Sequence, residues 1–390
     1  MKERYKLTIE PLTPVHIGTG VELTPLDYKV TSKLGTIDFK KNMYFKFSSD
    51  KILKRMIESG DSQKLAKFEE ASVKGNMKEL QSFFQQNLTS VEDLDYPCEV
   101  TNGFVKRYSE NQGKDPYDNA SKVYQMYRPE GLKTPVIPGS SLKGSIRTAV
   151  LNSILYDISD EKYNVLKDEF NKVKDPKTFE TKLQKALLGS YSDAKNDPFR
   201  AVQIADCSFS AKNSQLVGEL YNVSLNQQNK KIEHLKIQIL AEVIKGNLMG
   251  TSEKAETILL LDSDLLKTNQ ITKKISAEEI AKSCNNFFKT QFDNEFEKFY
   301  ELCESTNCSK LDELDKQISN IVNANDNSFV IRVGRWSQVE FVTFGSDFRT
   351  PKTPKGKDGK PKGWGGTRTL FDYNGQYLPM GWCKCTIEKI

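Results

Sequence analysis

The stretch IPGSSLKGSIRTAVLNSIL, from Ile137 to Leu155, decides how the rest of the sequence is interpreted. We expect it to form a helix entered through a Pro-Gly turn at Gly139, with Ser140 or Ser141 capping the helix by accepting a hydrogen bond from a free backbone N–H. Gly144 is expected to allow tight packing. Apolar residues recur at helical spacing and predict one buried face, made of Leu142, Ile146, Val150 and Ile154.

Two cations stand near the entrance of this predicted helix. Lys143 and Arg147 are four residues apart and share a face. Free N–H groups, the positive end of the helix dipole and two cations together form a site suited to phosphate. A capped surface helix with solvated cations is the alternative. A P-loop NTPase is disfavoured, because that motif needs Lys directly after its second Gly, whereas Ser145 follows Gly144.

Composition indicates a globular protein of two domains. The chain has 390 residues, of which 37% are hydrophobic and 28% charged. No apolar run approaches the roughly 18 residues of a membrane span, and the first residues enter a strand pattern without an apolar signal region. We therefore expect a cytoplasmic protein. The net charge of +5 does not by itself imply a polyanion-binding surface, so such a surface must be inferred from local clusters of Lys and Arg.

No metal site and no cofactor are expected. The cysteines Cys303, Cys308, Cys383 and Cys385 form two loose pairs whose spacing is not that of a zinc ribbon. No acidic cluster of ligand spacing is present either.

Hydrophobic patterns along the chain predict a mixture of strands and helices. Tyr5, Leu7 and Ile9 alternate with polar residues as in a half-buried strand, and PLTPVHIGTG then supplies a turn around His16. In that turn Gly18 and Gly20 let another backbone come close. Further strands are expected at 27–31, 36–39, 43–47, 201–210, 235–244, 257–261, 329–333, 339–344 and 382–387, and helices within 50–88, 161–188, 277–303 and 311–322.

The order of these elements predicts an α+β fold. Strand, helix and strand-pair order occurs twice, which favours two tandem ferredoxin-like (RRM-like) domains with helical insertions and glycine-rich loops. Residues 212–229, polar and rich in Asn and Gln, are the best boundary candidate. We therefore expect an N-terminal domain of residues 1–215 and a C-terminal domain of residues 230–390.

Two segments combine cations with aromatic residues. Residues 96–138 lack a regular pattern and predict either a protruding hairpin that stacks on bases or an ordinary surface insertion. Residues 351–368 carry six cations against one anion. There we expect a disordered loop at 352–360 and a nucleic-acid contact at 364–368, where glycines permit close approach, Trp364 offers a stacking face and Arg368 a planar donor.

Four motifs together resemble a known family. The sequence contains PVHIGTG after its first strand, IPGSSLKGSIRTAV, then GWGGTRTL and LPMGW near its end. This combination resembles the RAMP proteins of type III CRISPR systems, most of all those of the type III-A (Csm) effector complex. The resemblance spans nearly the whole chain.

This resemblance implies a fold, partners and a binding surface. It implies tandem RRM-like domains and one copy capping the backbone at the 3′ end of the crRNA, in contact with the neighbouring Csm backbone and small helical subunits. It also implies support of 3′ maturation by host trimming nucleases. The resemblance also implies a set of RNA-binding residues, which are His16, Gly18, Gly20, Gly139, Ser140, Ser141, Lys143, Gly144, Arg147, Gly363, Gly365, Gly366 and Arg368. To these we add Lys362 and Trp364, because they belong to the same basic, glycine-rich loop.

Catalysis is the competing interpretation. A metal-independent endoribonuclease that processes precursor crRNA needs a general base near pH 7, and the chain has only His16 and His234. Asp27 is a candidate acid for cutting target RNA, although it resembles an ordinary strand entry. Because His16 has no second His beside it in the sequence, we expect a non-catalytic RNA-binding subunit. A subunit that only bridges proteins is the third possibility.

Overall fold

The computed structural model describes most of the chain. The described residues are 2–172, 176–188, 197–210, 215–226, 231–250, 253–268, 274–301, 308–324, 326–348 and 367–390.

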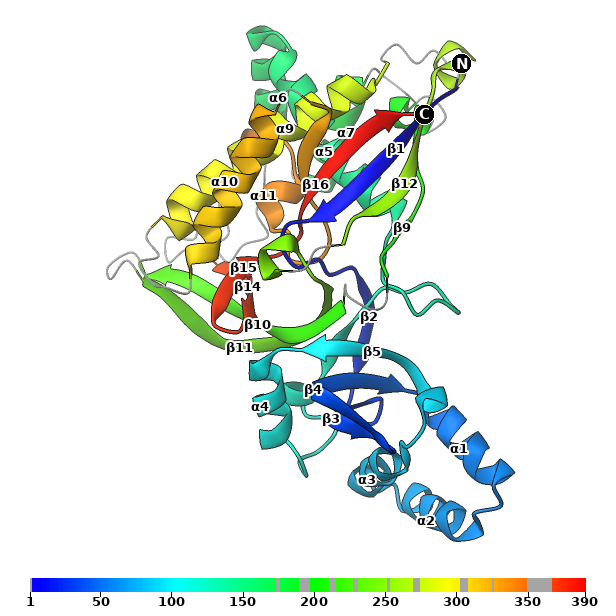
Figure 1. Ribbon diagram of the computed structural model, residues 1–390. Coiled ribbons are helices and arrows are strands. Elements are labelled where there is room, and N and C mark those ends of the chain that lie inside the picture. The colour runs from blue at the N-terminus through cyan, green and yellow to red at the C-terminus, as the bar shows by residue number, and fades with distance from the viewer. Residues whose placement is uncertain are drawn as a thin grey trace.

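The first strand of the chain is the middle strand of a five-stranded antiparallel sheet (Figure 1). Its burial alternates as the sequence predicts, with Leu7 and Ile9 buried between partly exposed neighbours. Leu7 lies opposite Ile387 on one side, and Ile9 lies opposite Cys385. The strand order is β13-β16-β1-β12-β8. The bounds are β1 (Lys2–Pro11), β8 (Val202–Ile204), β12 (Ala255–Asp262), β13 (Ser328–Arg332) and β16 (Trp382–Lys389).

Two long helices pack against this sheet and against each other. They are α5 (Gly139–Asp157) and α9 (Ala277–Glu295), the second continuing into a π-helical turn at Phe296–Tyr300. Apart from β13, an additional edge strand that lies between α9 and β16 in the chain, the elements of this layer come in the order β1, α5, β8, β12, α9 and β16. This is the βαββαβ order of a ferredoxin-like unit. One such unit is therefore assembled from strands that span almost the whole chain.

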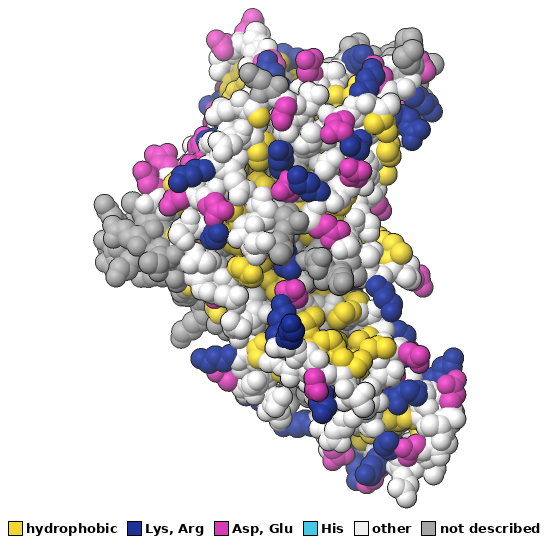
Figure 2. All heavy atoms as spheres, viewed as in Figure 1, with side chains coloured by type: hydrophobic (Ala, Val, Ile, Leu, Met, Phe, Trp, Pro, Cys, Tyr) yellow, Lys and Arg dark blue, Asp and Glu magenta, His cyan; other side chains and the backbone are white. Residues whose placement is uncertain are grey.

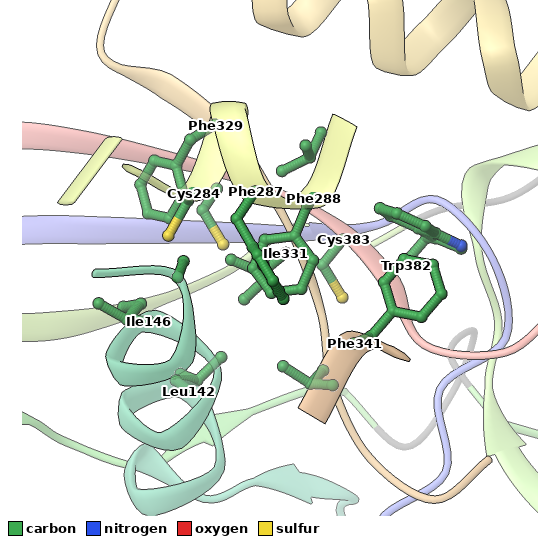
Figure 3. Packing of buried hydrophobic residues seen from close by; sticks show 14 of the residues in the cluster. Leu142, Ile146, Cys284, Phe287, Phe288, Phe329, Ile331, Phe341, Trp382 and Cys383 are labelled. Atoms are coloured by element: carbon green, nitrogen blue, oxygen red, sulfur yellow. The ribbon is translucent and has the colours of Figure 1, made fainter. Parts of the chain in front are cut away.

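The main hydrophobic core lies between the two helices and the sheet. Figure 3 shows Leu142 and Ile146 of α5 in the same buried cluster as Phe287 of α9. Trp382 is fully buried and packs edge-to-face against the rings of Phe292 and Phe341, at 5.2 and 5.3 Å between centroids. All four residues of the predicted apolar helix face are buried, which confirms that prediction.

A second sheet extends the molecule away from this core. Its strand order is β2-β6-β11-β10-β5-β4-β3, and β14 pairs with both β10 and β15. The long hairpin of β10 and β11 forms its spine. The bounds are β2 (Gly18–Leu23), β3 (Tyr28–Leu34), β4 (Ile37–Phe47), β5 (Leu94–Val100), β6 (Val123–Met126), β10 (Gln215–Asn226), β11 (Lys231–Ile244), β14 (Thr367–Tyr373) and β15 (Gln376–Pro379).

Of the remaining helices, α6 and α7 lie at one end of the molecule and α1 to α3 at the other, whereas α10 and α11 pack beside α9 (Figure 1). Three of them form a lobe beside β3 and β4, as predicted for residues 50–88 (Figure 1). A two-stranded pair, β7 (Val136–Ile137) with β9 (Cys207–Ser208), leads into α5. The helix bounds are α1 (Ser49–Glu58), α2 (Ser62–Val73), α3 (Met77–Asn87), α4 (Asn102–Glu110), α6 (Asp160–Lys172), α7 (Pro176–Leu188), α8 (Ser263–Thr268), α10 (Ser309–Asn323) and α11 (Val339–Val342).

Three expectations about local structure are wrong. Residues 339–344 form no strand, because α11 turns Phe341 into the core against Trp382. Residues 96–138 are not irregular throughout, since they contain β5, α4, β6 and β7. Residues 215–226, within the expected linker, form β10 in the middle of the second sheet.

Strands from both predicted domains share the five-stranded sheet. β1 comes from residues 1–215, whereas its two neighbours, β12 and β16, come from residues 230–390. The mixed α+β class is confirmed. The arrangement as two tandem units with a boundary near residue 215 stays a prediction.

Two glycines of α5 give a matched test of its packing. An added Cβ at Gly139 would lie 2.0 Å from the carbonyl oxygen of Ile204, whereas one at Gly144 would meet nothing within 4 Å. The tight position is therefore Gly139 and not Gly144. We expect Gly139→Ala to lower the free energy of unfolding by about 1–3 kcal/mol through overpacking. Gly144→Ala should raise it by about 0.5–1 kcal/mol, because Ala favours the helix. Urea denaturation measures both, and equal stability of the two variants would contradict this account.

Candidate nucleic-acid interface

Three segments that are distant in sequence meet near the entrance of α5. The N–H of Tyr127 donates to the carbonyl oxygen of Ile17 at 2.7 Å, and the N–H of Val136 donates to that of Tyr127 at 3.1 Å. The N–H of Arg335 donates to the carbonyl oxygen of His16 at 2.8 Å. These bonds bring together the turn at residues 16–20, the strand that leads into α5 and the loop at residues 333–338.

The N-terminus of α5 is occupied by a carboxylate of the protein itself. The backbone N–H of Gly139 donates to Oδ1 of Asp206 at 2.8 Å, and the cap residue is Pro138. The prediction that Ser140 or Ser141 caps the helix is wrong, because both lie inside the helix and the cap residue is Pro138, whose side chain makes no cap hydrogen bond. Ser140 is exposed and Ser141 half-buried. One of the N–H groups expected to bind phosphate is thus already bound to an anion.

The two cations of α5 have different environments. Arg147 forms an ion pair with Asp197 at 2.9 Å, donates to Gln184 at 3.1 Å and lies over the ring of Phe199. Lys143 is half-buried, and burial lowers its pKa. Within residues 2–172 and the other described ranges its ammonium has no acidic partner at ion-pair distance. Lys143, rather than Arg147, is therefore available to an external anion.

Arg368 lies in the protein interior and not in a surface loop. Its Nε is 2.6 Å from Glu295, its guanidinium is also 3.4 Å from Glu340, and the side chain has no exposed area. Two buried carboxylates thus hold the guanidinium inside, which contradicts its predicted contact with RNA. The other predicted members of this loop, Lys362, Gly363, Trp364, Gly365 and Gly366, lie outside the described residues.

His16 is a buried structural residue. Its Nδ1 is 2.7 Å from the carbonyl oxygen of Glu242, its ring packs on that of Trp336 at 4.9 Å, and the residue is 0% exposed. Burial is the main cause that lowers its pKa to about 4. Direct contact of this side chain with RNA is therefore contradicted. The neighbouring Gly18 and Gly20 are exposed on β2, and Gly20 has a φ of +84°.

Sequence reasoning missed the most accessible cation of this region. Arg335 is exposed, and its guanidinium carbon lies 4.1 Å from the ring centroid of Tyr124 and 5.0 Å from that of Trp336. The available signal was the tripeptide Gly-Arg-Trp directly after an apolar strand, which has the same residue types as the loop that we did single out.

The surface as a whole carries both signs of charge. Figure 2 shows Lys and Arg side chains interspersed with Asp and Glu over the face in view. Within the described ranges no helix is long and apolar enough to cross a membrane. The same part of the chain contains no group of three or more residues able to hold a metal ion.

Comparisons with known proteins identify a family. A family model described as the RAMP superfamily matches residues 8–355. The fold is similar to a chain in a Csm-crRNA-target RNA ternary complex of a type III-A CRISPR-Cas system, with a TM-score of 0.66, 17% identity and 100% of both chains covered. It is also similar to Csm5 of T. onnurineus, with a TM-score of 0.63, 18% identity and 96% and 99% of the chains covered. No curated protein matches the sequence.

The burial of His16 predicts a loss of stability in acid. The unfolded chain binds a proton at this residue with a pKa near 6.5, whereas the folded protein does so only near pH 4. Its contribution to the free energy of unfolding is therefore complete above about pH 6.5 and falls by about 3 kcal/mol as the pH drops to about 4. In urea denaturation across this range, the free energy of unfolding of the wild type should approach that of His16→Gln as the pH falls. A constant difference between the two would contradict the burial of a neutral histidine.

The buried charges predict a structural role for Arg368. We expect Arg368→Ala to lower the free energy of unfolding by about 3–5 kcal/mol, because it removes one partner from a buried ion pair. Lys143→Ala, which breaks no ion pair with a described residue, is the matched control and should change it by less than about 0.5 kcal/mol. Thermal or urea denaturation of both variants measures the difference. A neutral effect of Arg368→Ala would show that its guanidinium is not held inside.

Proposed function

Because this chain belongs to the RAMP superfamily, we propose that it is a non-catalytic crRNA-binding subunit of a type III-A CRISPR (Csm) effector complex. In this role it corresponds to the fifth Csm protein. One copy caps the backbone at the 3′ end of the crRNA, contacts the neighbouring backbone and small helical subunits, and supports crRNA 3′ maturation by host trimming nucleases in antiviral defence.

One observation carries this proposal. The fold agrees over the full length of both chains with a subunit of a Csm complex, and over nearly the full length with Csm5. Agreement over whole chains includes the helical lobe and the long hairpin, and not only the ferredoxin-like unit that many unrelated proteins share.

The surface near α5 suits an RNA backbone. Lys143 supplies a cation without an acidic partner among the described residues, and Ser140 adds an exposed hydroxyl. Gly144, one turn into the helix, has open space around it, and Gly18 and Gly20 present exposed backbone nearby. Contacts of this kind bind phosphate and position the strand without reading its sequence.

The candidate catalytic residues are held in structural roles. His16 is buried and neutral at pH 7, so it has no access to a substrate hydroxyl. Asp27 closes a local turn, where Oδ2 accepts from the N–H and the hydroxyl of Thr24 at 2.9 and 3.0 Å. The side chain of His234 lies outside the described part. The placement of His16 and Asp27 in these structural roles therefore favours an RNA-binding function over endoribonuclease activity.

Lys143→Ala tests the phosphate contact in the assembled complex. We expect the complex to release its crRNA at lower salt than the wild type, and the slope of log affinity against log salt to fall by about 0.7, as for one lost contact to a single strand. Lys54→Ala, which removes an exposed cation on α1, is the control and should leave retention unchanged. RNA extracted after stepwise salt washes measures both.

Three other outcomes would contradict parts of the proposal. A wild-type chain that does not co-purify with the other subunits and crRNA would refute the role itself. Unchanged crRNA retention and length in Lys143→Ala would instead favour a subunit that only bridges proteins. Cleavage of repeat RNA by the purified chain in EDTA, lost in His16→Ala, would establish the endoribonuclease.

A further inference from the structure

We propose that Tyr124, Arg335 and Trp336 form a base-stacking platform for single-stranded RNA. This inference rests on the proposed function and deepens it, because it names where unstacked bases bind. The platform stands beside the turn at residues 16–20, and the motifs by which the chain was related to its family include none of its three side chains.

The platform combines two aromatic rings and a guanidinium in one surface cluster. The rings of Tyr124 and Trp336 are 6.0 Å apart at 78° to each other, and the guanidinium of Arg335 lies within 4.1 and 5.0 Å of their centroids. Arg335 is exposed, and both rings are partly exposed. Arg stacks on bases as well as on aromatic side chains, and every base has a π-face, so such a cluster accepts any sequence.

The side-chain donors of Arg335 form no hydrogen bond or ion pair with the residues that the structure describes. Other arginines pair with carboxylates: Arg55 with Asp93, Arg107 with Glu219, Arg128 with Glu242, Arg147 with Asp197 and Arg332 with Glu295. The guanidinium of Arg335 has no carboxylate within ion-pair distance among the described residues, and its neighbours there are rings. A guanidinium provides five N–H donors, so Arg335 can bind a phosphate or a base edge while it stacks.

Glycine keeps the approach to Arg335 open. An added Cβ at Gly18 would lie 3.8 Å from Cδ of Arg335 and 3.2 Å from Nε2 of His16. A side chain at this position would therefore fill the space beside the cation. β2, which begins at Gly18, is an edge strand whose first five residues are exposed. An RNA backbone can thus reach the platform along this edge.

The loop that carries Arg335 and Trp336 is held in one strained conformation. Trp336 and Gln338 both have a φ of +65°, a backbone conformation that is strained for a non-glycine residue. The N–H of Arg335 is fixed on the carbonyl oxygen of His16, and the Ser337 hydroxyl donates to the carbonyl oxygen of Gly334 at 2.7 Å. The buried ring of His16 packs against the ring of Trp336, with 4.9 Å between the centroids. The rings are therefore pre-organised, which lowers the entropic cost of binding.

Binding of matched oligonucleotides to the full-length chain tests the platform. Fluorescence anisotropy compares a labelled oligouridylate with an abasic ribose-phosphate oligomer of the same length. We expect Trp336→Leu, which keeps an apolar side chain without a stacking face, to weaken oligouridylate binding about 5- to 150-fold. Binding of the abasic oligomer should change less than about twofold. Tyr156→Ala removes an aromatic side chain of α5 that is 56% exposed and should affect neither.

Arg335 provides a second variant that does not depend on core packing. Arg335→Ala should weaken binding of both oligomers, since it removes charge and stacking together. Arg335→Lys should keep the abasic oligomer bound while it loses part of the preference for bases. Circular dichroism and thermal denaturation verify that each variant is folded.

The results that would overturn the platform are specific. Folded Trp336→Leu and Arg335→Ala variants that bind oligouridylate as tightly as the wild type would refute it. Equal losses on both oligomers in Trp336→Leu would show that stacking is not involved. Unchanged RNA affinity with loss of neighbouring subunits from the complex would instead make this surface a protein contact. Because crRNA retention by the assembled wild-type complex tests the proposed function separately, the two can fail independently.

Discussion

The hydrogen bonding of β1 between β12 and β16 is the constraint on which the rest of the structure depends. The first strand of the chain has no partner among the strands that follow it closely, and its backbone groups are satisfied only when strands from the second half arrive on both sides. This pairing brings the two ends of the chain together and makes a sheet that α5 and α9 can cover. The turn after β1 is then fixed beside the loop that follows β13. The candidate interface is therefore built from segments more than 300 residues apart.

Buried charges connect this scaffold to the interface. Glu295 of α9 pairs with Arg332 at the end of β13 and with Arg368 at the start of β14, and the second of these also reaches Glu340. Such charges are costly to remove from water, so each depends on its partners. Arg332 stands three residues before Arg335, and its carbonyl oxygen accepts from the Ser145 hydroxyl of α5 at 3.1 Å. The buried pairs thus fix the base of the loop that presents the platform, and Arg335 is left exposed at its surface.

The helix α5, the helical lobe at residues 50–88 and the first strand were predictable, because local patterns decide them. The apolar face of α5 and the alternation in β1 are periodicities of short segments, and both are confirmed. The contact at the start of α5 was not predictable, since Asp206, which bonds to Gly139, comes from the connection between β8 and β9, far along the chain. Val339–Val342 was misassigned because a short apolar run fits a strand or a buried turn equally well. Arg368 was misassigned because basic and glycine-rich surroundings predict solvent, whereas its partners come from α9 and α11.

The sequence by itself determined the α+β class, the core face of α5 and the motifs that resemble RAMP proteins. Each of these is carried by residues close together in the chain. Only the tertiary structure decided which cations reach the surface. Three arginines, Arg147, Arg368 and Arg335, stand near glycines in the sequence. The first two form ion pairs with carboxylates, whereas the third lies over two aromatic rings. The accessibility of a charge depends on which carboxylates and rings the fold places around it. Those neighbours come from distant segments, so no local pattern contains them.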